Sequence, residues 1–399
     1  MYKTIIVLIS GAVILCFAAF NNKFPLLTTD TGFFINSAFN RDVSIYNTTW
    51  YGLFIAHSSW GKLIWLIVFS QCLILSITLF YAFRYFIKER NYEVPYLAFL
   101  FFTTFCMSAS VTSSTIDPGV FASITIVSTG LLLFVKSLSR RDFIIIAIIA
   151  VISSGMALSN LFTMILITVI YGIRLQLKNR YRTSVAIQTN IKRVLTVLSL
   201  AGTTFLLISA VHFCSGGDFN IISLVNVQVP VKESVADMYP NKGPIAKAIS
   251  EPGSNPDKQK LNYILKSSVN VEIAGYNRTV EQSETFKAIY RWYNTDVREC
   301  LITRQFQGWL TFTYLNYAQI ISVLACICLF IISVIKNRRS NYGYWLFFIS
   351  QAILIQILVN ALLSNQYNYR LVSQVIWLLP MPVFFYLSGN ELIKKIGLN

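Results

Sequence analysis

The chain has 399 residues, of which 55% are hydrophobic and 13% charged, and its net charge is +16. A mean hydropathy of +0.58, with repeated apolar runs long enough to cross a bilayer, excludes an ordinary soluble domain and predicts an all-α polytopic membrane protein. The positive charge does not require a nucleic-acid partner, because most basic residues lie in or beside short loops, as the positive-inside rule expects.

One polar segment, residues 214–308, holds 11 of the 33 Lys and Arg and 10 of the 17 Asp and Glu, so this segment is nearly neutral. The other 22 basic residues cluster at the ends of apolar runs and mark predicted cytoplasmic loops. The sequence contains no Walker A loop, no dinucleotide glycine fingerprint and no paired Cys or His spacing of a metal site. Soluble nucleotide-binding and zinc-binding classes are therefore excluded.

The first apolar run, residues 4–20, is predicted to be a retained helix, because no small-residue cleavage site follows it. Lys3 precedes it, so the N-terminus is expected in the cytoplasm and residues 21–60 in a long first outer loop. Part of that loop, residues 51–56, is expected to lie along the membrane interface as an amphipathic segment. The next predicted helices span residues 63–83, 94–111 and 118–135.

The apolar run 143–174 is interrupted near residues 155–160 and has basic residues on both sides. Two basic flanks require an even number of crossings, which favours two short helices, 143–157 and 161–175, with Asn160 at the outer face. One long helix is the alternative, and it would invert all later topology. Short paired helices are typical of segments that line a cavity rather than lipid.

The remaining apolar runs predict helices at residues 194–213, 314–335, 344–363 and 371–387. The predicted organisation is an N-terminal membrane module of about seven helices (1–213), an extracytoplasmic domain (214–313) and a C-terminal module of about three helices (314–399). Both termini are then cytoplasmic. Cys214 and Cys300 lie near the two ends of the outer domain, where they either form a disulfide or remain separate free thiols.

Asp30 stands just after the first helix, within the stretch Phe24–Phe34. A carboxylate at a membrane surface needs water, a cation or a hydrogen-bond partner. One interpretation is a solvated loop aspartate that caps a short helix starting near Thr31. The other is a catalytic carboxylate at the mouth of a membrane cavity.

The predicted topology gathers few carboxylates at the outer face, chiefly Asp30 and Asp117. Asp117 also suits a helix cap, with Pro118 in the first helical turn. Transfer of a sugar from a phosphate-linked lipid needs a base near the attacking hydroxyl and cations on the departing phosphate. The candidate substrate- and phosphate-binding residues are Lys23, Arg41, His57, Asn160 and Arg370. Arg370 has the alternative role of an arginine that anchors the chain at the interface.

Two short stretches, Thr29–Phe34 in the first outer loop and Thr115–Gly119 after the third helix, resemble the GT-C superfamily of integral-membrane glycosyltransferases. The late outer domain is similar in layout. The resemblance implies that Asp30 is the catalytic base. It also implies that Asp117 is a second acidic site, which can hold a divalent metal such as Mg or Mn. The implied partners are a polyprenyl-phosphate-sugar donor, a lipid-linked or other envelope glycan acceptor such as O-antigen or lipopolysaccharide, and membrane lipids.

Three alternatives remain open at this point. A lipid-linked saccharide polymerase or ligase would use outer-loop arginines and a histidine. A flippase or transporter would place ionisable residues inside its helices, where His212 is the main candidate. A non-catalytic membrane scaffold is the third. No retention signal is present, which favours the bacterial inner membrane with the active site on the periplasmic face.

Overall fold

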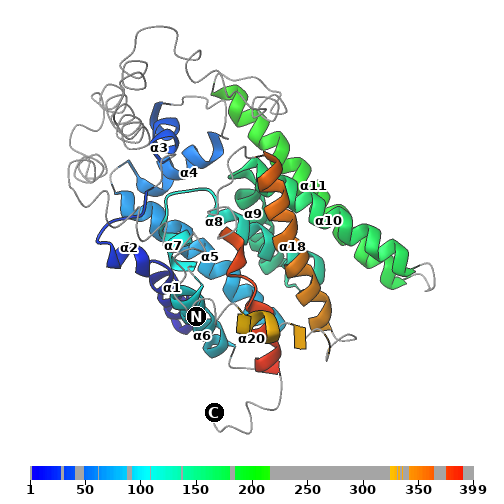
Figure 1. The fold of residues 1–399 in the computed structure, drawn as a ribbon. Coiled ribbons are helices and arrows are strands. Elements are labelled where there is room, and N and C mark those ends of the chain that lie inside the picture. Colours follow the sequence, from blue (N-terminus) through cyan, green and yellow to red (C-terminus); the bar gives the residue numbers. More distant parts are fainter. Residues whose placement is uncertain are drawn as a thin grey trace, which may run out of the picture.

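The protein is described here from a computed structural model, which describes residues 2–27, 31–40, 49–61, 63–87, 92–107, 109–135, 138–179, 185–215, 324–329, 331–332, 335, 341–363 and 374–389. Within these ranges the chain is almost entirely helical (Figure 1). The N-terminal helices are α1 (Tyr2–Leu15), α2 (Phe17–Asn21), α3 (Thr31–Asn40), α4 (Thr49–Ser59), α5 (Ile64–Phe86), α6 (Glu93–Cys106) and α7 (Ala109–Ser114). The others are α8 (Val120–Phe134), α9 (Arg140–Gly155), α10 (Leu158–Asn179), α11 (Val185–Cys214), α18 (Asn341–Leu363) and α20 (Met381–Gly389).

Three helical segments are long and apolar enough to cross a membrane: Ile64–Phe86, Leu158–Gln176 and Asn190–Cys214. They coincide with three of the predicted crossings, so the prediction of a helical membrane protein is confirmed at that level. Shorter apolar helices occupy Tyr2–Leu15, Glu93–Cys106, Val120–Phe134, Phe348–Val359 and Gln374–Phe385. The total of about ten crossings stays a prediction, and the outer domain 214–313 lies almost wholly outside the described residues.

Helix α8 is the centre of the bundle. Its residues Val120 to Leu133 are all buried, and α5, α9, α10, α11 and α18 pack around it (Figure 1). Helix α8 has no charged residue, and its hydroxyl-bearing residues Ser123, Thr125, Ser128 and Thr129 are all buried. Such groups are accommodated better among protein groups than in lipid, which favours a central position for this helix. In contrast, α10 and α11 lie side by side and extend away from the bundle, with large apolar side chains left exposed.

The interrupted run 143–174 forms two separate helices, α9 and α10, as the two-helix interpretation predicts, so the single long helix is wrong. Helix α9 ends at Gly155, where the Trp50 ring of α4 approaches closely; a Cβ at Gly155 would be 3.0 Å from the indole nitrogen. Asn160 then donates to the Ser153 carbonyl at 3.3 Å. The same carbonyl also accepts the Met156 amide, at 3.3 Å, in the last turn of α9.

The predicted helix 4–20 is divided at Cys16 into α1 and α2, and the predicted helix 94–111 stops at Cys106, before α7. The division at Cys16 is stabilised by α7, which lies against the α1–α2 junction. The Ser113 hydroxyl donates to the Leu15 carbonyl at 2.9 Å, and the Ser110 hydroxyl accepts from the Ala18 amide at 2.6 Å. Such side-chain bonds satisfy backbone groups that a break in an apolar helix would otherwise leave without a partner.

The predicted interfacial segment 51–56 forms part of α4, but it is not a simple amphipathic surface helix. Tyr51 and Ile55 are completely buried in the bundle, whereas Leu53 and His57 are exposed. The Tyr51 ring packs edge-on against Phe34 of α3, with ring centroids 5.1 Å apart. Helices α3 and α4 therefore form a packed cover over one end of the bundle.

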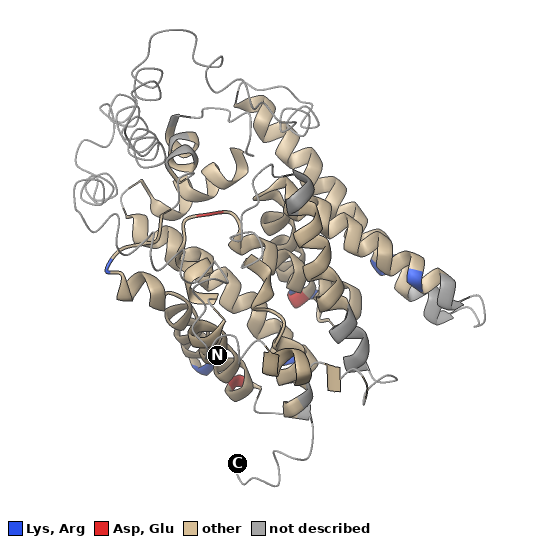
Figure 2. Ribbon diagram, in the orientation of Figure 1, with Lys and Arg blue, Asp and Glu red and all other residues tan. Residues whose placement is uncertain are grey.

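Charged side chains of the described residues lie mostly at helix ends (Figure 2). Lys3 pairs with Glu93 at 3.3 Å, and Arg84 pairs with Asp142 at 3.9 Å. Each pair joins two helix ends that the basic-loop pattern assigns to the cytoplasm. The first outer loop and the Asp117 turn also meet each other, as described below, so the packing is consistent with the predicted alternation of the chain.

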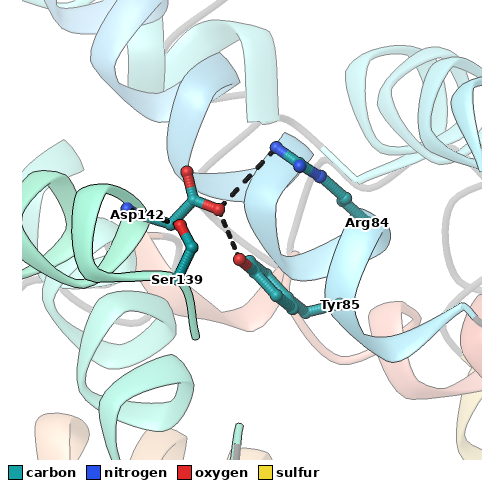
Figure 3. A network of polar contacts seen from close by, with 4 residues as sticks. All are labelled: Arg84, Tyr85, Ser139 and Asp142. Carbon is teal, nitrogen blue, oxygen red and sulfur yellow. Dashed lines mark hydrogen bonds and ion pairs between the residues drawn. The ribbon is translucent and has the colours of Figure 1, made fainter. Parts of the chain in front are cut away.

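The Asp142 carboxylate lies between Arg84 and the hydroxyl of Tyr85, which donates to it, while the Ser139 side chain accepts from the Asp142 amide (Figure 3). Burial of this carboxyl opposes ionisation, but the hydrogen bonds from Tyr85 and Ser139 and the charge of Arg84 outweigh it, and the pKa of Asp142 is lowered. Because the carboxylate is favoured in the folded state, its contribution to stability is present above the ordinary value of 3.8 and is lost as the pH falls through the lower, folded pKa.

We therefore expect Asp142→Asn to lower the unfolding temperature at pH 7, with a free-energy cost of about 1–3 kcal/mol for bonds to a charged group. The difference from the parent should shrink as the pH falls below about 4. Thermal unfolding of detergent-solubilised protein at several pH values measures this. Glu93→Gln is the matched control; its partner Lys3 is 76% exposed, so the effect should be small. An equal loss at every pH would contradict the role of the charge.

Candidate functional site

The turn that carries Asp117 lies beside the segment that follows α2. The Leu26 amide donates to the Ser114 carbonyl at 3.1 Å, and the Ile116 amide donates to the Leu26 carbonyl at 2.9 Å. These bonds form a single parallel β-bridge between Leu26 and Thr115. The segment just before the Thr29–Phe34 stretch therefore lies against the Thr115–Gly119 stretch, although about ninety residues separate them in the chain.

A side-chain bond continues this contact at the start of α3. The Thr31 hydroxyl, 2% exposed, donates to the Ile116 carbonyl at 3.1 Å. Thr31 directly follows Asp30 in the chain, and Ile116 directly precedes Asp117. Asp30 itself lies outside the described residues, as do Arg41 and Arg370. The contact fixes the neighbours of both predicted acids in one place.

Asp117 is buried, with 6% of its surface exposed. Its Oδ1 atom accepts the Gly119 amide at 2.7 Å, two residues further along, in the turn that precedes α8. The N-cap of α8 is Gly119 and no side chain caps it, so the predicted cap at Asp117 is wrong: Asp117 closes the turn that leads into the helix. The same Oδ1 atom lies 3.5 Å from the amide nitrogen of Gln374, which comes from the segment before α20.

Gln71 of α5 binds the backbone just before the Asp117 turn. This residue was not identified from the sequence. It is completely buried in α5, and its Nε2 atom donates to the carbonyls of Ser113 and Thr115 at 2.6 and 2.7 Å. Its Oε1 atom accepts from the Tyr51 hydroxyl of α4 at 3.5 Å. The available signal was a glutamine within the apolar run Ile64–Phe86, since a buried amide in such a helix must find partners.

The other predicted binding residues are placed differently. Lys23 is exposed in the turn after α2, with a φ of 58°, and His57 is exposed in the last turn of α4. Asn160 is 1% exposed and bonds to Ser153 and to Gln356, whose amide nitrogen lies 3.4 Å from the Asn160 oxygen. These contacts give Asn160 a helix-joining role in the bundle. Its predicted role in substrate binding stays a prediction, as do those of Lys23 and His57.

The structure describes only some of the residues on which the cysteine and metal predictions depend. Cys214 is exposed at the end of α11, and Cys300 lies outside the described residues, so the choice between a disulfide and two free thiols stays open. Among the residues that the structure describes, no group of three or more His, Cys, Asp or Glu side chains gathers to hold a metal. A Mg or Mn ion at Asp117 would therefore need further oxygen ligands from other parts of the chain, from water or from a substrate phosphate.

Comparison of the chain with known protein families, with curated proteins and with solved structures found no match. The class that the fold defines is a helical membrane protein. Any narrower assignment depends on the residues gathered around Asp117.

Proposed function

We propose that the protein is a membrane glycosyltransferase that moves a sugar from a polyprenyl-phosphate-linked donor to a lipid-linked glycan or other envelope acceptor on the outer face of the membrane. The observation that carries the proposal is the meeting of three distant segments at one turn. Leu26 and Thr31 contact the turn from the first outer loop, and Gln374 contacts it from the C-terminal module. Each segment adjoins a residue that the sequence assigns to the reaction.

In the proposed reaction, an acceptor hydroxyl attacks the anomeric carbon of the donor sugar while the bond from that carbon to the phosphate oxygen breaks. The hydroxyl proton passes to a carboxylate base, for which we propose Asp30, and polyprenyl phosphate leaves. Cationic side chains stabilise the charge that develops on the phosphate, and we propose Lys23, Arg41 and Arg370 for this role. Asp117 is proposed to be the second acid of the site, as in the GT-C enzymes that the sequence resembles.

The arrangement suits this chemistry because the donor and the acceptor differ in polarity. A lipid-linked donor reaches the site from the bilayer, and a hydrophilic acceptor reaches it from the aqueous side. A buried acidic turn beside a long outer loop lies where both can meet, and exclusion of water there would strengthen each electrostatic contact with the phosphate.

The test uses the purified full-length protein in vesicles, with a panel of polyprenyl-phosphate hexoses and an envelope glycan lipid as acceptor. We expect release of polyprenyl phosphate and extension of the acceptor by a single sugar, both seen by mass spectrometry. Joining of preformed oligosaccharides would instead identify a polymerase or ligase. Movement of the donor across the bilayer without any new glycosidic bond would identify a flippase and overturn the proposal.

A further inference from the structure

Gln374 is the residue of the C-terminal module that contacts the acidic turn. It is 6% exposed, and its side-chain amide lies 3.5 Å from Asp117 Oδ1 across 257 positions of sequence. Its backbone carbonyl accepts from the Ser123 hydroxyl of α8 and from the indole nitrogen of Trp377. Both the backbone and the side chain of Gln374 are therefore held against the start of α8.

Gly119 shows how closely the Gln374 amide approaches the turn. The φ of Gly119 is −62°, a value open to any residue, so backbone conformation does not require glycine here. A Cβ at this position would lie 2.0 Å from Nε2 of Gln374 and 2.6 Å from Oδ1 of Asp117, so the ends of both side chains would have to move. The absence of a side chain at Gly119 therefore leaves room for the amide group of Gln374 from the C-terminal module.

We propose that Gln374 is a positioning residue for Asp117, and that the acidic site is complete only when the C-terminal module is seated on α8. The inference rests on the proposed function. A carboxylate that accepts two donors from fixed backbones, the Gly119 amide and the Gln374 side chain, is held in one orientation. Without the Gln374 donor, Asp117 keeps its bond to the Gly119 amide but loses the constraint that the C-terminal module places on its direction.

The first test replaces Gln374 by Met, which has a similar length and no donor. We expect kcat for sugar transfer to fall by about 10- to 100-fold, as is typical when a supporting hydrogen bond behind a functional group is removed. The KM for the donor should change little, because the variant alters the orientation of Asp117 and not the donor-binding contacts. Parental kcat in this variant would overturn the inference.

A second pair of variants separates positioning from packing. Gly119→Ala should lower kcat, because its methyl group must displace the end of the Gln374 side chain and the Asp117 carboxylate. Adding Gln374→Ala removes the contact with the amide but supplies no donor to Asp117, so the double variant should not recover kcat. The matched control is Gly202→Ala in α11, where a Cβ meets nothing within 4 Å and kcat should stay parental. Recovery of kcat in the double variant would mean that Gln374 only packs.

An infrared measurement tests the contact without any transfer assay. The protein is labelled with ¹³C-aspartate, and the spectrum of Asp117→Asn is subtracted to isolate the carboxyl stretching band of Asp117. We expect this band to shift in Gln374→Met, because one hydrogen bond to the carboxyl group is lost. A shift in a protein that transfers no sugar would end the proposed function and leave the contact standing. An unchanged band would overturn the positioning inference even in an active enzyme.

Discussion

Replacing Asp30 with Asn is expected to reduce the rate of sugar transfer by about 10²- to 10⁴-fold, the usual cost of removing a general base. The reason is the anchoring of its neighbour: Thr31 donates to the Ile116 carbonyl, which places this part of the first outer loop beside the Asp117 turn. The measurement is the initial rate of polyprenyl phosphate release by purified protein in vesicles at saturating donor.

This substitution also distinguishes the two interpretations of Asp30. Asn and Asp are about equally good helix caps, so a residue that only caps the helix starting at Thr31 tolerates the change in both stability and rate. Asp42→Asn, in the same predicted outer loop, is the matched control and should transfer sugar at the parental rate. If Asp30→Asn also does so, Asp30 is a cap, and the base must be assigned to Asp117 or the proposal withdrawn.

Replacing Gln71 with Leu is expected to give a large loss of stability. The variant leaves the Thr115 carbonyl without the Gln71 donor, and a buried acceptor left unpaired costs about 1–3 kcal/mol. The Ser113 carbonyl keeps the thiol of Cys72 as a donor, at 3.3 Å, so most of the effect should arise at Thr115. We expect a clear drop in the unfolding temperature and a loss of transfer, because the Asp117 turn is no longer held against α5.

Thr78→Val is the control in the same helix. Its hydroxyl is buried as well, but the bond it makes returns to the Ile74 carbonyl of its own helix at 2.8 Å, and no turn depends on it. Both variants are compared by thermal unfolding in detergent and by transfer in vesicles. A Gln71→Leu protein as stable as Thr78→Val would mean that the bridge between Leu26 and Thr115 holds the turn without the amide of α5.

Several features could be predicted from the sequence because they depend on residues near one another in the chain. Apolar runs of membrane-spanning length predicted the positions of α5, α10 and α11. The interruption near residues 155–160 predicted the separation of α9 from α10. Asp117 before Pro118 predicted that a helix starts nearby, and the Asp117 carboxylate accepts the Gly119 amide in the turn that leads into α8. In each case the physical cause depends only on residues that are close together in the chain. That cause is either the transfer of apolar surface from water or a local hydrogen bond.

The helix breaks show where this local reasoning fails. Residues 4–20 are uniformly apolar and predict one helix, yet the chain divides at Cys16. The bonds that stabilise the break come from Ser110, Ser113 and Ser114 of α7, about a hundred residues later. The apolar pattern of residues 4–20 therefore cannot predict the break, because it gives no information about these serines.

What the sequence by itself determined is therefore the class of protein, the approximate helix positions and the acidic turn at Asp117. Only the tertiary structure decided what meets that turn: Leu26 and Thr31 from the first outer loop, Gln71 from α5 and Gln374 from the C-terminal module. These partners lie between 42 and 257 positions from the residues they bond. Helix packing sets such distances, because each buried polar group bonds to whichever donor or acceptor the packing brings within reach.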